Sequence, residues 1–318
     1  MKQEFVWGFV GCGWAASDMV EAFLKNGRKI HGVYCRNTEN CKKFAEKYGI
    51  EHIYKTADEL FCDKEITALY IATPHHVHFE YIKKAVECGI HVLCEKAITV
   101  NEDQYDDVWS ANGKDVKIAE AMTVYHMPLH RSLSRRVISG EFGKTNLIQV
   151  NFGSTKPYDM ENRFFSKKTA GGALLDIGVY ALACAEMYTN KSIESIITEA
   201  EFAESGVDKS FGAVIKREEG QIVTVTCSLC SKLPKKIIIS CDKAYIEIEN
   251  YPRADSALIV YNDGHTERVC EGKSENALIY EVENFEKDAY SYQIHTKNVM
   301  HIVSELKNTW GLFYECED

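Results

Sequence analysis

The first residues that indicate chemistry form a glycine-rich turn near the start of the sequence. An apolar run at residues 5–10 is followed by the pattern Gly-x-Gly-x-x-Ala at residues 11–16, and then by apolar residues at helical spacing. In such a strand, turn and helix, Gly11 permits the sharp bend and Gly13 lets the backbone approach a pyrophosphate. Ala16 is small enough for the helix to pack closely on the strand. The helix start favours an anion, because its N–H groups and dipole point toward the ligand.

We therefore expect this turn to bind a dinucleotide. The cofactor-binding residues expected here are Gly11, Cys12, Gly13, Trp14, Ala15 and Ala16. Triplets of this kind also arise by chance in turns that contain glycine, so the alternative is a turn that binds nothing. The surrounding strand and helix are the context that favours the dinucleotide.

The end of the second expected strand indicates which nicotinamide cofactor is preferred. An NAD site usually has an acidic residue about twenty residues beyond the glycines, where it bonds the ribose hydroxyls. Here the sequence reads Tyr34-Cys35-Arg36-Asn37, with no acidic residue before Glu39. Arg36 is suited to pair with a 2′-phosphate, and Asn37 adds hydrogen bonds. We predict a preference for NADP, with NAD possible; the alternative is a solvated arginine after a strand.

Composition limits the class of protein. The chain has 318 residues, 45% of them hydrophobic and 26% charged, which suits two globular domains. Its net charge of −10 and the lack of a long basic run argue against nucleic acid and anionic membranes as partners. We find no signal peptide and no apolar stretch of membrane-spanning length.

The twelve cysteines are scattered, and several lie inside apolar runs, as reduced and buried thiols do in cytoplasmic proteins. Cys227 and Cys230 have CxxC spacing but no second pair, and we place both inside a strand. A metal or redox site there is therefore disfavoured, and we expect a cytoplasmic location.

Strands and helices alternate through the first third of the chain. Expected strands cover residues 5–10, 30–35, 66–72, 91–94 and 116–122. A first helix is expected after the glycine turn, with apolar residues at helical spacing over 19–24 and an end at Asn26-Gly27, and further helices cover 39–48, 79–88 and 102–110. This alternation predicts an α/β fold with right-handed βαβ units, a Rossmann doubly wound parallel sheet over residues 1–122. Capping-box residues at 56–59 predict a further short helix.

The pattern changes after residue 122. Segments rich in β-branched residues follow one another with short turns, which predicts a C-terminal α+β domain built on a largely antiparallel open sheet over residues 123–318. Helices are expected near 129–139, 172–188, 279–291 and 296–310, and the last two can pack back on the first domain. We expect the ligand at the seam between the two domains.

With these elements in place, the sequence resembles the Gfo/Idh/MocA oxidoreductases, the family of glucose–fructose oxidoreductase and inositol dehydrogenase, over nearly its whole length. The resemblance rests on Gly-x-Gly-x-x-Ala at 11–16, Ala-Thr-Pro at 72–74 with His78, Glu95-Lys96, Glu120, and Gly-Gly-Ala-Leu-Leu-Asp-Ile-Gly-Val-Tyr at 171–180. The last motif is similar to the branch with dihydrodiol dehydrogenase and the NADP-dependent xylose dehydrogenases. Two positions depart from the pattern: Ala97 stands where the family usually has proline, and Tyr125 where this branch often has arginine.

The resemblance and the residue types together suggest the catalytic groups Lys96, Tyr180 and Asp176. Lys96 follows an apolar strand, so it should project from the carboxyl edge of the sheet. Asp176 and Tyr180 are four apart on a helix that starts at two glycines, so they should share a face. We expect Tyr180 to act as general acid/base, with Lys96 lowering its pKa and Asp176 fixing the substrate or the lysine. The structural alternatives are a surface lysine, a core tyrosine and a helix-capping aspartate.

The resemblance also implies that residues after two more strands line the cofactor cleft. The expected cofactor-binding residues are Thr73, Pro74, His75, His78, Glu95 and Lys96. The histidines at 75, 76 and 78 invite a metal interpretation, but neighbouring histidines rarely chelate one ion, so no metal is expected. His126 and Arg163, together with Tyr180, are the candidates for binding substrate; ordinary polar contacts are the alternative for the first two.

These features predict an NAD(P)-dependent oxidoreductase that transfers a hydride between a nicotinamide and a hydroxyl-bearing carbon of a sugar, a polyol or a trans-dihydrodiol. The alternatives are a non-catalytic NAD(P)-binding sensor of the same fold and, more weakly, a reductase of a linear tetrapyrrole or an imine. The expected partners are a small-molecule substrate and a second copy of the chain, because the resemblance implies a homodimer or a dimer of dimers paired through the open sheet. Nothing in the composition names the substrate.

Overall fold

The computed structural model describes residues 5–112, 116–287 and 292–317. Within it the chain forms two compact units. The first unit comprises Met1–Thr99, Asp103–Ala121 and Leu278–Gln293, and the second comprises Val100–Glu102, Met122–Ala277 and Ile294–Asp318. The division into a nucleotide domain at 1–122 and a substrate domain at 123–318 stays a prediction about function.

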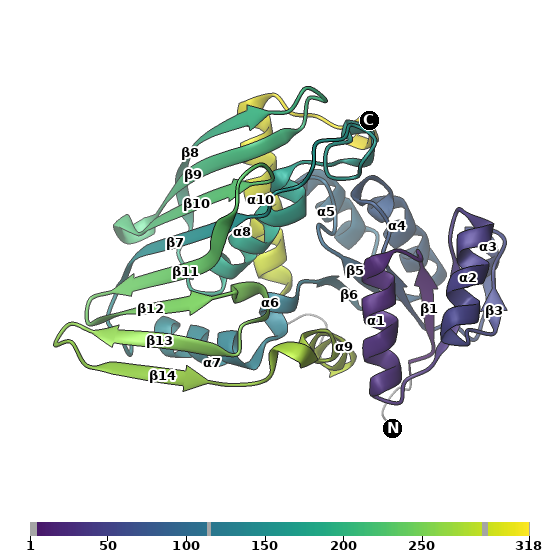
Figure 1. The fold of residues 1–318 in the computed structure, drawn as a ribbon, viewed down its shortest axis with the longest axis horizontal. Helices are drawn as coiled ribbons and strands as arrows, with labels where there is room; N and C mark the ends of the chain where they lie inside the picture. The colour runs from purple at the N-terminus through teal and green to yellow at the C-terminus, as the bar shows by residue number, and fades with distance from the viewer. Residues whose placement is uncertain (1–4, 113–115, 288–291, 318) are drawn as a thin grey trace. The chain divides into compact units, whose positions relative to one another are not determined.

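The first unit is built on a six-stranded sheet whose strands are all parallel (Figure 1). In spatial order the strands are β3 (His52–Ile53), β2 (Ile30–Tyr34), β1 (Trp7–Val10), β4 (Ala68–Ile71), β5 (His91–Glu95) and β6 (Ile118–Ala121). Its helices are α1 (Trp14–Lys25), α2 (Thr38–Tyr48), α3 (Ala57–Cys62), α4 (His78–Cys88) and α5 (Glu102–Ser110), with α9 (Ala277–Lys287) arriving from late in the chain. This order and direction confirm the expected doubly wound parallel sheet.

Local sequence explains where the helices of this unit start and end. The Thr56 side chain accepts a hydrogen bond from the Glu59 N–H at 3.2 Å, as the capping pattern predicts. The Glu59 carboxylate accepts from the Lys55 N–H at 2.7 Å, one residue earlier than a strict capping box would place it. Gly49 and Gly89 end α2 and α4 in the left-handed conformation, which glycine adopts without steric cost.

The second unit is built on an eight-stranded sheet in the order β14-β13-β12-β11-β7-β10-β9-β8. The strands are β7 (Thr145–Gly153), β8 (Ile193–Phe202), β9 (Asp208–Arg217), β10 (Ile222–Ser228), β11 (Leu233–Cys241), β12 (Ala244–Glu249), β13 (Ser256–Tyr261) and β14 (Thr266–Cys270). Neighbours are antiparallel except β7 and β10, which are parallel. The expected α+β unit with a largely antiparallel sheet is therefore confirmed.

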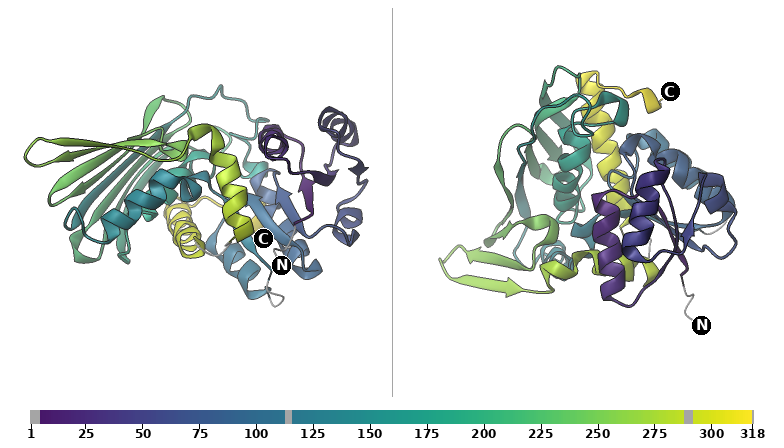
Figure 2. Two further views of the ribbon diagram at one scale, coloured as in Figure 1. Left: turned by 90° about the horizontal axis from the view of Figure 1, so that it is seen from below. Right: turned by 45° about the vertical axis from the view of Figure 1, so that its right-hand side comes forward.

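Helices cover one face of this sheet and leave the other open (Figure 2). They are α6 (Thr123–His126), α7 (Pro128–Ile138), α8 (Val179–Glu186) and α10 (Gln293–Trp310). Buried and exposed residues alternate along the strands, so that Val150 in β7 and Ile215 in β9 belong to the core whereas Leu147 and Val214 are exposed. The alternation of apolar and polar residues along these strands therefore distinguishes the covered face of the sheet from the open face.

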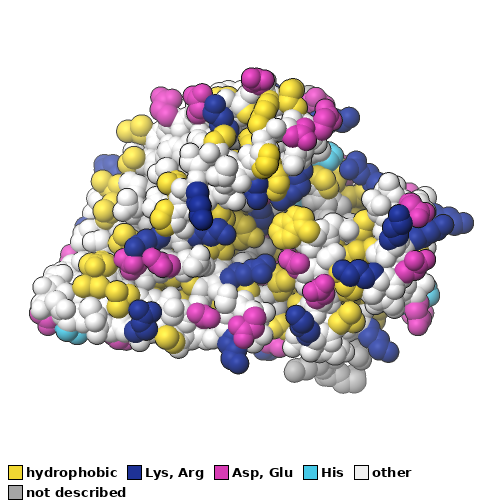
Figure 3. Space-filling view, viewed as in Figure 1, with side chains coloured by type: hydrophobic (Ala, Val, Ile, Leu, Met, Phe, Trp, Pro, Cys, Tyr) yellow, Lys and Arg dark blue, Asp and Glu magenta, His cyan; other side chains and the backbone are white. Residues whose placement is uncertain are grey.

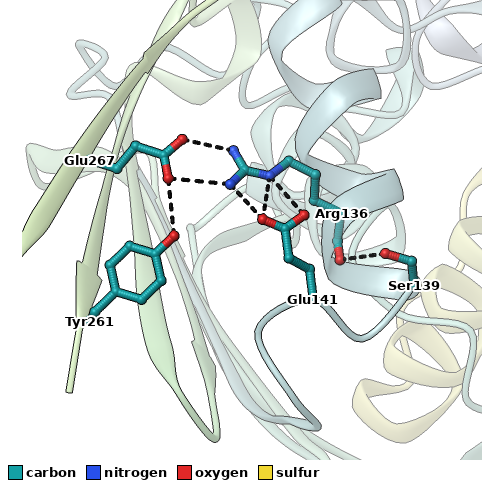
Figure 4. Close-up of polar contacts among 5 residues, drawn as sticks. All are labelled: Arg136, Ser139, Glu141, Tyr261 and Glu267. Carbon is teal, nitrogen blue, oxygen red and sulfur yellow. Dashed lines mark hydrogen bonds and ion pairs between the residues drawn. The ribbon is translucent and has the colours of Figure 1, made fainter. Parts of the chain in front are cut away.

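A polar network fixes α7 against the last hairpin of this sheet (Figure 4). The Arg136 guanidinium donates to Glu141 in the loop after the helix at 3.0 Å and to Glu267 in β14 at 3.1 Å. The Tyr261 hydroxyl in β13 donates to the same Glu267 at 3.0 Å. One arginine thus ties a helix to two strands, which its planar fork of five donors makes possible.

The structure also shows the state of the cysteines. The twelve cysteines all fall in the described ranges, and none of them forms a disulfide. Cys227 is buried in β10, but Cys230 is exposed and lies beyond the end of that strand, so the sequence-based placement of both in one strand is wrong by two residues.

Among the described helices, none combines the length and apolar character needed to cross a membrane.

A buried ion pair joins α8 to β9 in the core of the second unit. The Arg217 guanidinium donates to the Glu186 carboxylate, and each side chain is 2% exposed. Arg217 also donates to the Lys191 carbonyl at 2.7 Å, and Asn298 donates to the other Glu186 oxygen at 3.1 Å. Burial raises the pKa of Glu186, although Arg217 and Asn298 act in the opposite direction. The carboxylate is therefore stable in the core only because of these partners.

We predict that Arg217→Met lowers the free energy of unfolding by about 3–5 kcal/mol, because Glu186 then becomes a buried charge without its cation. The loss should shrink as the pH falls, since a carboxyl whose pKa is higher in the folded than in the unfolded state takes up a proton on folding. Urea unfolding followed by circular dichroism at pH 5 and pH 8 measures both effects.

The control is Lys216→Met. Lys216 directly precedes Arg217 in β9, and the substitution breaks its exposed pair with Glu194 in β8. It should change the free energy of unfolding by less than about 1 kcal/mol. Equal losses in the two variants would contradict the special role of the buried pair.

Candidate active site

The glycine turn lies at the carboxyl edge of the first sheet, where the strand order reverses. β1 ends at Val10 between β2 and β4, and the Gly11 N–H donates to the Tyr34 carbonyl at 2.8 Å. Gly11 has φ +107°, and a Cβ built on it would lie 2.2 Å from the Ala72 carbonyl oxygen. Only glycine fits this position, which brings the turn against the segment that follows β4. Ligands of doubly wound sheets bind at this switch point.

The residues of the turn fit the pyrophosphate of a dinucleotide. A Cβ built on Gly13 would meet no atom within 4 Å, so open space adjoins the backbone there. Gly13 begins α1 without a side-chain cap, and the first turn of that helix carries no acidic residue. Ala16 is fully buried against the sheet, whereas Trp14 is 61% exposed. The helix start therefore offers an anion its N–H groups and the positive end of its dipole.

Arg36 and Asn37 follow β2 at the same edge of the sheet, and both are exposed. The Asn37 side chain accepts a hydrogen bond from the Asn40 N–H at 2.9 Å, so it caps α2. Arg36 lies one residue beyond the buried Cys35. The structure thus gives Asn37 a structural use that does not prevent a contact through its amide nitrogen.

The segment after β4 carries the other expected cleft residues. Thr73 and Pro74 are half-buried, and His75 is buried at the start of a short 3-10 helix (His75–Val77). His78 is fully buried, and its two ring nitrogens lie 2.8 Å from the carbonyl oxygens of Thr73 and Ala97. Burial lowers the pKa of His78 to about 4. His78 therefore links the segments after β4 and β5 inside the unit.

The structure gives no support to a metal site at these histidines. In the part of the chain that is described, no three or more histidine, cysteine or acidic side chains form a group that could hold an ion.

Lys96 follows β5 and is held by contacts on both sides of it. The Tyr70 hydroxyl in β4 donates to the Glu95 carboxylate, and the Ile98 N–H donates to Glu120 in β6 at 3.1 Å. His78 bonds the Ala97 carbonyl, and the peptide bond between Lys96 and Ala97 is cis. Lys96 itself is buried, with 8% of the residue exposed. Three neighbouring strands and α4 therefore fix the backbone from which the lysine extends.

In the second unit, two glycines start the helical segment that carries the other candidates. A Cβ built on Gly171 would lie 2.7 Å from the Arg163 carbonyl oxygen, and one built on Gly172 would lie 2.1 Å from Oδ1 of Asp208. Gly172 also has φ +118°. Protein atoms crowd both positions, so this close packing of the helix start requires glycine at each.

Asp208 and Tyr314 hold this helix start in place. The Leu174 N–H donates to Oδ2 of Asp208 at 2.7 Å, and the Tyr314 hydroxyl donates to the Gly171 carbonyl at 2.7 Å. Burial raises the pKa of Asp208 to about 7, although backbone donors near the helix start oppose the shift. Both residues bond the segment that carries Asp176 and Tyr180. Neither was identified from the sequence, because a single aspartate near a strand and a single tyrosine near the end of the sequence match no motif.

Asp176 and Arg163 meet in the second unit, as an ion pair with 3.4 Å between Nη2 and Oδ1. The residues Leu174–Gly178 form a π-helical turn that continues as α8, so Asp176 lies in the wider turn and Tyr180 in the α-helix. The Asp176 side chain is 8% exposed, whereas Tyr180 is half-buried with its ring 6.2 Å from that of Phe152. The sequence predicts one regular helix here and misses the π-turn, a feature that recurs at functional sites.

His126 ends α6, which packs against α8. It is buried, and burial, with a smaller contribution from Arg131, lowers its pKa to about 3. The imidazole is therefore neutral near pH 7, with one nitrogen that donates and one that accepts.

The expected residues are divided between the two units. The first unit holds Gly11, Cys12, Gly13, Trp14, Ala15, Ala16, Arg36, Asn37, Thr73, Pro74, His75, His78, Glu95 and Lys96. The second unit holds His126, Arg163, Asp176 and Tyr180. That the two groups act on one substrate stays a prediction.

Comparison with known proteins adds the family. The family described as "Oxidoreductase family, NAD-binding Rossmann fold" matches residues 5–120, and the GFO/IDH/MocA C-terminal domain matches residues 130–247. Trans-1,2-dihydrobenzene-1,2-diol dehydrogenase of Xenopus laevis is 26% identical over 289 residues, which are 87% of each chain. The enzyme of that name from Sus scrofa is 29% identical over 247 residues, 76% of this chain and 73% of its own.

Solved structures have the same fold. Levoglucosan dehydrogenase in complex with NADH and levoglucosan superposes with a TM-score of 0.85 at 18% identity, over 97% of this chain and 98% of its own. A 3-ketoreductase from Actinomadura kijaniata in complex with NADP and TDP-benzene gives 0.84 at 19% identity, over 96% and 98%. Because both family domains match and together cover most of the sequence, the chain belongs to the Gfo/Idh/MocA family of NAD(P)-dependent oxidoreductases.

Proposed function

We propose that this oxidoreductase transfers a hydride between a nicotinamide and a hydroxyl-bearing carbon of a sugar, a polyol or a trans-dihydrodiol. The proposal rests mainly on the helical segment that carries Asp176 and Tyr180. Asp176 pairs with Arg163, and buried hydrogen bonds hold the start of the segment. Similar proteins named trans-1,2-dihydrobenzene-1,2-diol dehydrogenase, 3-ketoreductase and levoglucosan dehydrogenase support the substrate class. Activity of the purified protein on pentoses, hexoses, inositols and dihydrodiols, read as nicotinamide absorbance, tests it.

In the proposed reaction the Tyr180 hydroxyl takes or returns the proton of the substrate hydroxyl. Lys96 stabilises the phenolate form of Tyr180 and bonds the substrate oxygen, because a nearby ammonium favours a negative oxygen. The pair of Arg163 with Asp176 orients hydroxyl groups of the substrate, and His126 supplies a neutral donor or acceptor. The nicotinamide, when bound, supplies the hydride.

We predict that Tyr180→Phe and Lys96→Met each lower kcat by about 10²–10⁴-fold, the usual contribution of acid–base groups. The dissociation constant for NADP should change little in Tyr180→Phe, because the phenol acts on the substrate proton. Steady-state kinetics and a fluorescence titration of the cofactor measure the two quantities.

Tyr280→Phe in α9 and Lys84→Met in α4 are matched controls that should keep normal turnover. Wild-type turnover in both Tyr180→Phe and Lys96→Met would show that the roles are wrongly assigned.

We propose that NADP is preferred over NAD, because Arg36 is exposed at the carboxyl edge of β2 and no acidic residue lies between the end of that strand and Glu39.

Arg36→Ala should raise the dissociation constant for NADP by about 10- to 100-fold, the effect of one charge-assisted hydrogen bond, and leave the dissociation constant for NAD nearly unchanged. Calorimetric titration with both cofactors measures this. Lys29→Ala, an exposed cation just before the opposite end of the same strand, is the control. Tighter binding of NAD by the unaltered protein would refute the preference.

We propose that the chain pairs with a second copy through the open face of its eight-stranded sheet. Hydrophobic side chains lie on that face among lysines and acidic residues (Figure 3). Ile197 is 72% exposed, its partner in the sheet Val214 is 42% exposed, and Leu147 beside Ile222 is 41% exposed. Such a row of apolar residues in water favours association.

Size-exclusion chromatography with light scattering should find a homodimer or a dimer of dimers. Ile197→Lys should shift the protein toward the monomer, because a charge would be buried in the interface. Ile294→Lys, an isoleucine that is 61% exposed on α10, should leave the mass unchanged. A monomeric unaltered protein at micromolar concentration would rule the interface out.

We also propose a cytoplasmic location, in keeping with cysteines that form no disulfide in the described ranges. Fractionation of the source cells tests this.

A further inference from the structure

A bulge in β11 directs a lysine onto the ring of Phe152 in the second unit. Three steps along β11, from Leu233 to Lys236, match only two steps along the antiparallel β7, so two residues of β11 face Phe152. Bulges of this kind re-aim side chains and are common next to active sites. Lys235 lies inside the bulge, and its Nζ is 4.8 Å from the centre of the Phe152 ring. That ring is in turn 6.2 Å from the ring of Tyr180, the proposed acid/base.

Two more cations lie over one aromatic ring beside the same helical segment. Nζ of Lys156 is 4.7 Å from the centre of the Phe164 ring, and the guanidinium carbon of Arg163 is 4.3 Å from it. Arg163 pairs with Asp176 at 3.4 Å, four residues before Tyr180. Lys156 and Arg163 are both half-buried, so neither is sealed in the core. The ring of Phe164 therefore connects Lys156 to the segment that carries the proposed catalytic groups.

A third element brings a further cation to β11. Arg253 ends a short 3-10 helix (Tyr251–Arg253) that packs against β11, and the Tyr251 ring is 6.1 Å from that of Phe152. Burial lowers the pKa of Lys235, and the charges of Lys156 and Arg253 lower it further. Like charges lower the pKa of a lysine in this way only at short range. Lys156, Lys235 and Arg253 therefore form one cluster, which we call the cation cluster.

The positive charge of the cation cluster is not balanced by acidic side chains. Among the residues that the structure describes, no carboxylate forms an ion pair with Lys156, Lys235 or Arg253. The next residue of the same strand, Lys236, does have an acidic partner, because Glu247 of β12 lies 2.6 Å from its Nζ. The whole chain carries a net charge of −10, so unbalanced cations are unusual in it. An anion bound at the cluster would offset the mutual repulsion.

We propose that the cation cluster binds an anionic group of the substrate, a phosphate or a carboxylate, while Tyr180 acts on a hydroxyl-bearing carbon of the same molecule. The inference rests on the proposed function, because it narrows the substrate of that site to an acidic or phosphorylated sugar or polyol. Ammonium and guanidinium groups form strong charge-assisted hydrogen bonds with both anions. Because the Phe152 ring lies next to both Lys235 and Tyr180, a molecule the size of a monosaccharide phosphate can reach both.

The first experiment measures turnover of matched substrates by the purified full-length chain with NADP or NAD. Each pentose, hexose and inositol is compared with its phosphorylated and its carboxylate form, which distinguishes the two anions. An anionic member should exceed its neutral counterpart in kcat/KM by at least about 10-fold, the effect of charge-assisted hydrogen bonds. Equal or higher values for every neutral member would overturn the inference and leave the proposed function in place.

The second experiment removes one charge of the cluster. Lys235→Met keeps an unbranched apolar stem that can contact Phe152 but lacks the ammonium group. It should raise KM for the anionic substrate about 10-fold and leave kcat and the KM of the neutral counterpart nearly unchanged. Lys243→Met, which removes an exposed lysine beyond the opposite end of β11, is the control and should change neither KM. Equal effects of Lys235→Met on the two substrates, or no effect, would overturn the inference.

The third experiment detects the anion without turnover. Acetic anhydride labels accessible lysines of the unaltered protein, and mass spectrometry after digestion gives the rate at each position. Millimolar phosphate or acetate should slow the labelling of Lys156 and Lys235 at least about threefold, as occupancy of two thirds of the site would, and leave Lys243 unchanged. Sodium chloride of the same ionic strength is the control.

The outcomes of the labelling experiment separate the two proposals. Protection by neither anion, or equal protection by sodium chloride, would overturn the inference. Protection of Lys156 and Lys235 without turnover of any substrate in the panel would support the anion site and contradict the proposed function.

Discussion

The arrangement of the first unit depends on a single steric constraint at Gly11. Its positive φ and its contact with the Ala72 carbonyl exclude any side chain, and this lets the chain turn from β1 directly into α1. The N-terminus of α1 then faces the edge at which β2, β4 and β5 also end. Arg36 and Lys96 follow two of those strands, so two cations and a helix start that could accept an anion share one edge of the sheet.

In the second unit, buried hydrogen bonds hold a helix start at which two glycines provide no side chains. Gly171 and Gly172 allow close packing, and Asp208 and Tyr314 bond the backbone from two segments that follow it 34 and 143 residues later. The π-helical turn that follows places Asp176 against Arg163 and leads into the helix of Tyr180. Buried hydrogen bonds of this kind restrict the local geometry more strongly than apolar packing alone.

The sequence predicts the fold well, because its signals are local. Glycine turns, capping residues and the periods of apolar residues identify the parallel sheet, the open antiparallel sheet and most of the helices. The parallel pairing of β7 with β10 depends on contacts between distant segments, which no local pattern records.

The site is predictable only in part, for the same reason. Residues in motifs, such as Gly11, Lys96 and Tyr180, are candidates that the sequence indicates; the structure gives their local positions, and their roles stay a prediction. Asp208 and Tyr314 were missed, because their importance comes from the backbone atoms they meet and not from their neighbours in sequence.

The contact of Tyr314 with Gly171 also bears on how the protein is made. Asp208 is 34 residues from Leu174 and is available soon after the helix leaves the ribosome, but Tyr314 is 143 residues from Gly171. At usual elongation rates that stretch takes roughly 7 to 30 s to synthesise. During this interval the nascent helix start has one of its two anchors, and its geometry becomes complete only when translation has passed residue 314.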